Sequence, residues 1–131
     1  MKVVFDTNIF ISAFITPGSQ AEKAVLRIIE GKDVLFLTKG ILDELLFILS
    51  TKFSRDKEEI SRVAVFLSEM AEWVEPSEEI NVLRDGPDNR ILECAFSGNA
   101  DIIVTGDREL LRLKRYGKTE IISLKEYLEK Q

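Results

Sequence analysis

Short apolar runs alternate along this chain with longer segments in which apolar residues recur every three or four positions. The runs with the length and composition of buried strands are residues 3–5, 34–37, 102–104 and 119–122, with a shorter candidate at residues 73–75. The segments with helical periodicity are residues 9–14, 21–30, 41–49, 56–73, 89–97, 110–113 and those after residue 123. This alternation predicts an α/β fold with a parallel sheet and helices on both faces.

Residues with strong local preferences mark several of the expected helix ends. Ser19 follows a Pro-Gly pair and is expected to cap the second helix, and Asp88 is a candidate cap for the helix over residues 89–97. Ser123 and Glu126 have the spacing of a capping box at the start of the last helix. Residues 77–87 are polar and rich in turn-forming types, so we expect a loop there.

The composition is that of an ordinary soluble globular protein. The 131 residues are 45% hydrophobic and 31% charged, and their number fits a single domain spanning residues 1–131. No apolar stretch is long enough to span a bilayer, and the first residues lack the pattern of a secretory signal. Cys94 is the only cysteine, which excludes an internal disulfide and favours a cytoplasmic protein without membrane association.

Histidine is absent from the sequence, and this limits the available chemistry. Catalysis by Ser-His or Cys-His pairs is excluded, as are zinc sites that need an imidazole or several thiolates. Carboxylates with an oxygen-preferring metal such as Mg²⁺ or Mn²⁺ remain the favoured tools. The formal net charge of −5 argues mildly against tight, non-specific nucleic-acid binding, although a bound ion offsets the charge of carboxylates gathered around it.

Two acids stand just beyond predicted strands. Asp6 comes directly after the first strand, and Asp107 follows Val104 with Thr105 and Gly106 between them. The carboxyl ends of parallel strands meet at one edge of a sheet, where ligands bind, so both acids are expected to face one crevice. A buried acid without a partner is costly to desolvate, and a divalent metal held by several carboxylates removes that cost.

Two further acids are candidates for the same crevice. Asp88 follows a Gly-Pro pair, where the simpler interpretation is a helix cap; the two roles are compatible, and Asp85 is a weaker candidate nearby. Glu44 lies inside an otherwise apolar helical segment, whereas Asp43 falls nearer its polar side. Glu44 is therefore the expected inward acid, with a solvated helix edge as the alternative.

These residues together resemble the PIN-domain family of metal-dependent ribonucleases. The resemblance covers nearly the whole chain, and it rests on residues 4–8 (VFDTN), Glu44, residues 85–95 (DGPDNRILECA) and residues 104–111 (VTGDRELL). Each piece is short, and their order and spacing make the match specific. The Gly-Pro-Asp-Asn and Thr-Gly-Asp forms look most like the subgroup of toxin components of toxin–antitoxin systems, akin to VapC-type toxins.

The resemblance implies a three-layer α/β/α domain with a roughly five-stranded parallel sheet. It implies that one or two Mg²⁺ or Mn²⁺ ions are bound, and RNA cleaved, by the residues Asp6, Glu44, Asp88 and Asp107. Asn8 and Thr105 are then expected to hold the acids or to touch the scissile phosphate, with Glu109 as an auxiliary candidate. The expected partners are RNA, a second copy of the chain in a homodimer, and an antitoxin protein.

Several cations near these acids are candidates for guiding an RNA backbone. They are Arg84, Arg90, Arg108, Arg112, Lys114, Arg115 and Lys118. For the group that follows Asp107, a solvated helix face is the simpler interpretation. Arg90 and Arg108 are the two that we assign to substrate binding.

Other functions fit the sequence less well. A non-catalytic PIN-like module that binds RNA or protein remains an alternative, although all the expected acids are present. An aspartyl-phosphate phosphatase usually has a second acid two residues after its nucleophile, and this chain has Asn8 there. A phosphoacceptor receiver needs an acid at the end of the middle strand, where Thr38 and Lys39 follow Leu37. A Rossmann domain needs a glycine-rich loop after its first strand, which is also lacking.

Overall fold

The computed structural model describes residues 1–130, and its element order confirms the predicted α/β alternation. The strands are β1 (Lys2–Phe5), β2 (Val34–Leu37), β3 (Glu72–Trp73), β4 (Ile102–Val104), β5 (Arg115–Tyr116) and β6 (Thr119–Ile122). The helices are α1 (Thr7–Ile15), α2 (Gln20–Ile29), α3 (Lys39–Thr51), α4 (Lys57–Met70), α5 (Gly86–Gly98), α6 (Arg108–Leu113) and α7 (Leu124–Glu129).

The strands form one sheet in the order β3-β2-β1-β4-β6-β5. The pairs β3–β2, β2–β1, β1–β4 and β4–β6 are all parallel, as expected. In the pair of β1 and β4, Phe5 lies opposite Val104. The sixth strand, β5, was not predicted and runs antiparallel to β6 at one edge. Only two residues long and composed of Arg115 and Tyr116, it has no apolar run that would mark it in the sequence.

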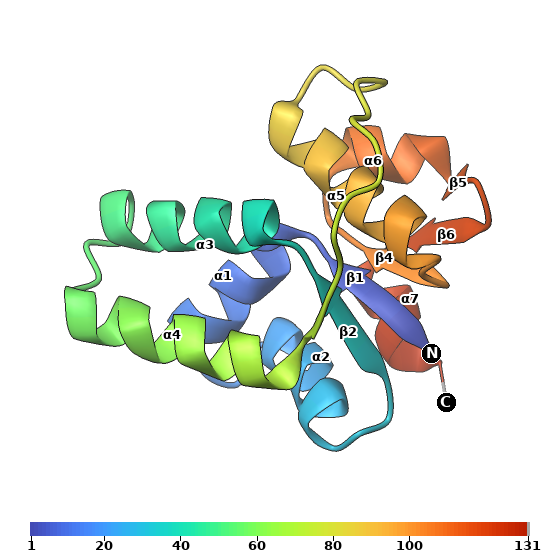
Figure 1. The fold of residues 1–131 in the computed structure, drawn as a ribbon. Helices are drawn as coiled ribbons and strands as arrows, with labels where there is room; N and C mark the ends of the chain where they lie inside the picture. Colours follow the sequence, from blue (N-terminus) through green and yellow to red (C-terminus); the bar gives the residue numbers. More distant parts are fainter. Residues whose placement is uncertain (131) are drawn as a thin grey trace.

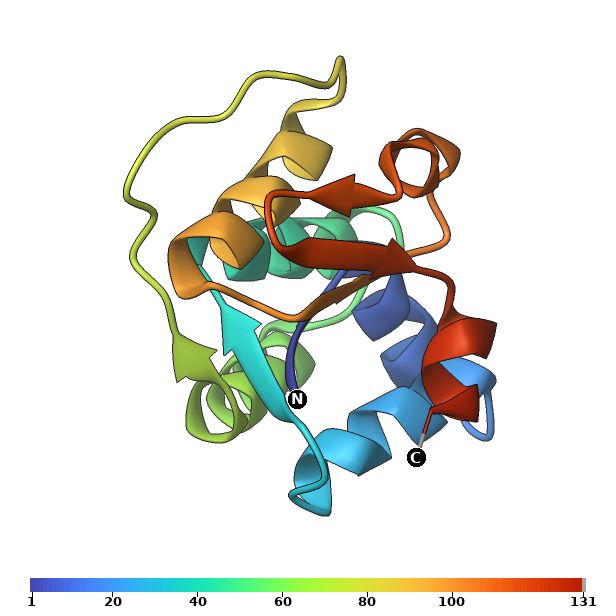
Figure 2. The same ribbon diagram turned by 90° about the vertical axis from the view of Figure 1, so that its right-hand side faces the viewer.

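Helices cover both faces of the sheet, which gives the three layers (Figures 1 and 2). Helix α5 packs on one face against β1, β2 and β4, and α1 packs on β1 from the other side with α2 and α7 beside it. At the C-terminal end of α5 a Cβ on Gly98 would lie 2.7 Å from Cδ2 of Phe36, so only glycine allows this approach. Helices α3 and α4 pack on each other and extend beyond the sheet (Figure 1).

The first strand is a continuous apolar run because it lies in the core of the protein. Val3, Val4 and Phe5 are fully buried, because both faces of β1 are covered by helices. The Phe5 ring packs against Phe10 of α1 and against Tyr127 of α7, with ring centroids 5.7 Å and 5.6 Å apart. Burial of a side chain of this size stabilises a fold by about 1.5–3 kcal/mol, so this strand provides a rigid base for Asp6.

Two predicted boundaries were wrong. The helix expected over residues 56–73 ends at Met70, because Glu72 and Trp73 pair with Phe36 and Leu37 as β3. Helix α5 begins at Gly86 rather than Asn89, and its cap is Asp85, whose side chain accepts a hydrogen bond from the backbone N–H of Asp88 at 3.4 Å. Asp88 is therefore inside the first turn of the helix.

Within residues 1–130, no helix combines the length and the apolar composition needed to cross a membrane. This agrees with the absence of a long apolar stretch in the sequence.

Candidate active site

Asp6 lies at the carboxyl end of β1, where the chain turns into α1, and is 5% exposed. Its Oδ2 accepts a hydrogen bond of 2.6 Å from the Thr105 hydroxyl, and its Oδ1 a long one of 3.5 Å from the Asn8 N–H. Burial raises the pKa of Asp6 and the nearby charge of Asp107 adds to this rise, whereas the bonds from Thr105 and Asn8 oppose it. These two hydrogen bonds fix the carboxyl group of Asp6 at the carboxyl end of β1.

Asp107 reaches the same place from β4. The parallel pairing of β1 and β4 aligns Phe5 with Val104, so the residues that follow each strand emerge side by side. The Thr105 hydroxyl accepts a hydrogen bond of 2.9 Å from the N–H of Asp107 while it donates to Asp6, and it thereby joins the two acids. Asp107 also caps α6, since its Oδ1 accepts from the N–H of Leu110 at 3.0 Å.

Asp88 is brought to this pair by the first turn of α5 and is 6% exposed. Within residues 1–130, its Oδ2 is one of the few buried side-chain atoms that lack a hydrogen-bond partner. Burial, followed by the negative charges of Asp107, Asp85 and Asp6, raises the pKa of Asp88 to about 7. A buried carboxylate with an unpartnered oxygen among other acids is a group that a cation would stabilise.

Glu44 is near these acids and does not join them. It is half-buried on α3, whereas Asp43 is exposed and pairs with Lys39, so Glu44 is the more inward of the two as predicted. It lines a hollow of about 280 Å³ with Thr7, Gly40, Ile41, Gly86, Pro87 and Arg90. Thr7 and Pro87 directly precede residues of the acidic crevice, so the Glu44 hollow adjoins that crevice.

The crevice itself is an open hollow of about 650 Å³. It is lined by Asn8, Arg84, Asp85, Asp88, Gly106, Asp107, Arg108 and Glu109. The crevice that contains Asp88 and Asp107 therefore also contains three residues named from the sequence, Asn8, Arg108 and Glu109. Another hollow, of about 180 Å³ between α1, α3 and α4, contains none of these residues.

The donor set suits a hard divalent ion. Within residues 1–130, no three aspartate, glutamate or cysteine side chains are arranged as a ready ligand set for a single ion. Mg²⁺ commonly takes only one or two carboxylates and keeps several waters, so the buried, unpartnered Oδ2 of Asp88 beside Asp107 and Asp6 is compatible with it. The structure thus offers oxygen ligands of the right chemistry at the predicted edge of the sheet.

A family model described as PIN domain matches residues 2–109. The chain belongs to the PIN domain family. It is 36% identical to the uncharacterized protein MJ1680 of Methanocaldococcus jannaschii over 132 positions, which cover 95% of this chain and 84% of that protein.

Solved structures with a similar fold include two VapBC complexes. VapBC2 from Rickettsia felis, bound to a DNA fragment from their promoter, matches with a TM-score of 0.64 and 21% identity over 94% of this chain and 98% of that one. VapBC-1 from nontypeable Haemophilus influenzae matches with a TM-score of 0.68 and 20% identity over 95% and 99%. At these identities the likeness establishes that the PIN domain and its neighbours share a fold.

Arg90 occupies a different place in the PIN domain from the one expected of a substrate ligand. Its Nη2 lies 2.8 Å from Oε2 of Glu93 and donates to the carbonyl of Ile80 at 2.8 Å. The guanidinium thus fastens the loop before α5 and lines the Glu44 hollow rather than the acidic crevice. Arg84, which the sequence analysis considered but did not assign to substrate binding, lines the crevice instead.

We expect the contribution of Asp88 to the stability of the metal-free PIN domain to fall as the pH rises from 3.8 to about 7. The folded protein retains the Asp88 proton up to a pKa of about 7, whereas the ordinary pKa of an aspartate, as in the unfolded chain, is 3.8. Between these values the folded state binds more protons than the unfolded state, so its stability falls as the pH rises. Thermal unfolding in EDTA across this range measures the effect.

Asp88→Asn is expected to lack this component of the pH dependence and to melt higher than wild type above pH 7. Asp43→Asn makes the same chemical change at an exposed position and is expected to retain the wild-type dependence. Equal pH dependence in wild type and Asp88→Asn would contradict the assignment.

Proposed function

We propose that this PIN domain is a metal-dependent endoribonuclease that hydrolyses RNA phosphodiester bonds. The observation that supports it best is that Asp88 and Asp107 line one open crevice and that the buried Asp6 lies close enough to affect the pKa of Asp88, in a chain without histidine. Acids gathered at a cleft, of which Asp6 and Asp88 have a raised pKa, are typical of functional sites. With neither imidazole nor exposed thiol, hydrolysis by a protein nucleophile is disfavoured.

In this proposal each residue has a defined task. Asp6, Asp88 and Asp107 would hold one or two Mg²⁺ or Mn²⁺ ions, with Glu44 acting from the adjoining hollow. A divalent ion supplies Lewis-acid stabilisation of phosphoryl oxygens and activates water as the nucleophile. Thr105 fixes the separation of Asp6 and Asp107 through its hydroxyl. Asn8 and Arg108 border the crevice, where a phosphodiester would enter.

We further propose a VapC-like role as the toxin of a toxin–antitoxin pair. The shared fold with the two VapBC complexes supports this, together with the Gly-Pro-Asp-Asn and Thr-Gly-Asp segments. The partners are then an antitoxin protein, RNA and a second copy of the chain. A single, buried cysteine is compatible with action in the cytoplasm.

A second candidate is a PIN module that binds RNA or protein without cleaving it. One observation favours it: within the described chain, residues 1–130, no three acids form a ready ligand set. Metal binding in calorimetry without RNA turnover would support this candidate over the nuclease.

The experiment is cleavage of a labelled, structured RNA in Mn²⁺, in Mg²⁺ and in EDTA. We expect products in either metal and none in EDTA. An Asp107→Asn preparation purified in parallel controls for contaminating nuclease, because a contaminant persists in it. Equal cleavage by both preparations, or none by wild type across several RNAs, would remove support for the nuclease.

A further inference from the structure

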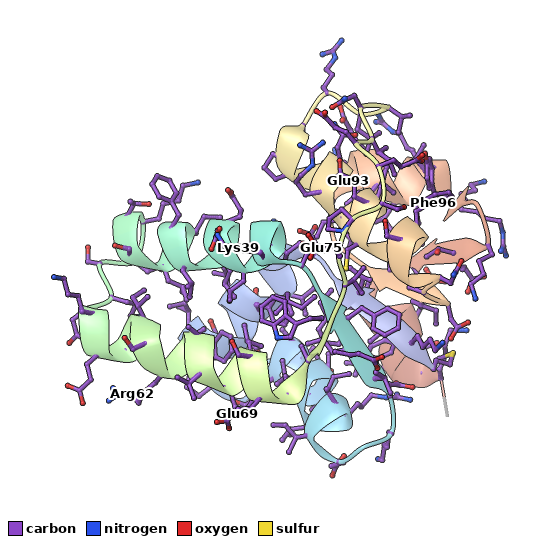
Figure 3. All side chains as sticks on the ribbon, viewed as in Figure 1. Lys39, Arg62, Glu69, Glu75, Glu93 and Phe96 are labelled. Carbon is purple, nitrogen blue, oxygen red and sulfur yellow. The ribbon has the colours of Figure 1, made fainter. Side chains whose placement is uncertain are left out.

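The loop between β3 and α5 is held against α5 by buried polar side chains of that helix. Glu93, 5% exposed, accepts a hydrogen bond of 2.8 Å from the N–H of Ile80. Asn89, 3% exposed, accepts from the N–H of Leu83 at 2.9 Å and donates to the carbonyl of Leu83 at 2.8 Å. The loop crosses α5 in Figure 1, and Figure 3 labels Glu93 on that helix. It is therefore a fixed segment.

This arrangement places the backbone of Arg84 between two anchored neighbours. Leu83 is held on one side by both polar groups of the Asn89 amide. Asp85 is held on the other side, because its Oδ1 caps α5 by accepting from the N–H of Asp88. The exposed side chain of Arg84 thus starts from a fixed point and lines the crevice that contains Asp88 and Asp107.

The crevice is rich in negative charge, so a cation in it matters for the binding of a phosphate. Four of the eight lining residues are the acids Asp85, Asp88, Asp107 and Glu109, and the only cations among the eight are Arg84 and Arg108. Within residues 1–130, none of the ion pairs involves either arginine. A phosphodiester that approaches these acids is repelled, so a nearby guanidinium that is not neutralised by a carboxylate favours its binding.

We propose that Arg84 supplies a guanidinium, besides that of Arg108, that binds an RNA phosphate at the crevice, and that Asn89 is the residue that positions Arg84. The inference rests on the proposed function, since it names the group that receives the RNA. Arg90, which is closer to Asp88 in sequence than Arg84 is, is excluded from this task by its contacts with Glu93 and Ile80. The anchored backbone lowers the entropy lost when the arginine engages a phosphate.

The first test is binding of a short, fluorescein-labelled single-stranded RNA in EDTA, followed by anisotropy at several salt concentrations. We expect Arg84→Ala to weaken binding by about tenfold and to reduce the slope of log K against log salt by about 0.7, as for the loss of one phosphate contact. Arg84→Lys is expected to restore the slope and only part of the affinity, because lysine lacks the bidentate fork.

Arg62→Ala is the matched control. Arg62 is an exposed arginine on α4, paired only with Glu58, and it lies well away from Glu93 and α5 in Figure 3. We expect it to change neither affinity nor slope. Because Arg84 is exposed, its variants keep the fold and decide the phosphate contact by themselves.

The positioning role has its own test. We expect Asn89→Ala to weaken RNA binding, and a subsequent Arg84→Ala change to have a smaller effect in that background than in wild type. In cleavage assays with metal, Arg84→Ala should raise KM about tenfold with kcat within about threefold, because it removes binding rather than chemistry. Independent, additive effects of the two substitutions would overturn the positioning role.

The outcomes separate this inference from the nuclease itself. If wild type binds RNA in an Arg84-dependent way and cleaves nothing, the phosphate contact stands and the nuclease fails. If wild type cleaves and Arg84→Ala leaves affinity, slope and KM unchanged, the nuclease stands and the contact is overturned. If wild type neither binds nor cleaves RNA, both are overturned.

Discussion

Asp6→Asn is expected to reduce metal-dependent RNA cleavage by a factor on the order of 10²–10³ and to leave the fold intact. The amide removes the negative charge at the end of β1 but keeps an oxygen that can still accept the 2.6 Å hydrogen bond from Thr105. The lost cleavage would therefore reflect lost charge at the acids rather than a displaced strand. Single-turnover cleavage in Mn²⁺ measures the effect, and thermal unfolding verifies the fold.

Asp43→Asn is the matched control for this result. It makes the same change on α3, at an exposed carboxylate whose partner is Lys39, and is expected to retain wild-type cleavage. If Asp6→Asn cleaves RNA as fast as Asp43→Asn, the carboxylate of Asp6 has no part in the reaction and the proposed metal site is wrong.

The second large effect concerns stability at the other end of the strands, where their amino ends lie. Asp33, just before β2, accepts hydrogen bonds from the Tyr127 hydroxyl at 2.6 Å and from the N-terminal ammonium at 2.8 Å, and its Oδ2 lies 3.4 Å from Nε of Arg27. The group joins β1, α2 and α7 around a side chain that is 4% exposed. We expect Asp33→Asn to lower the free energy of unfolding by about 2–4 kcal/mol, because it removes the charge paired with two cations and replaces one buried acceptor oxygen by an NH2 group that faces a donor.

Urea unfolding with Asp43→Asn as control measures this loss, since the exposed Lys39–Asp43 pair is worth about 0–1 kcal/mol. Burial opposes ionisation of Asp33, and the hydrogen bonds from the N-terminus and Tyr127 outweigh it, so the pKa of Asp33 is lowered. The stability that its charge contributes is thus present above 3.8 and is lost as the pH falls through the lowered pKa. A difference between wild type and Asp33→Asn that stays constant into acid would contradict this account.

The sequence by itself determined the fold and the position of two acids. Apolar runs mark β1, β2, β4 and β6 because strands covered on both faces are apolar throughout. Once those strands are parallel, their carboxyl ends share an edge, so Asp6 and Asp107 must meet there. The caps at Ser19 and Ser123 were predictable for a similar reason, since capping is a contact between residues three apart.

Only the tertiary structure decided the contacts that depend on the loop before α5. Local preference indicated Asp88 as the cap of that helix, whereas the observed cap is Asp85, and this leaves Asp88 in the first turn, where it faces Asp107. The sequence analysis assigned substrate binding to Arg90 rather than Arg84, but the buried Glu93 needs a cationic partner, and Arg90 is one helical turn away from it. Within residues 1–130, Arg84 has no such partner and lines the crevice. These contacts depend on long-range packing, which determines the carboxylates that are shielded from water. The spacing of residues in the sequence does not reveal this packing.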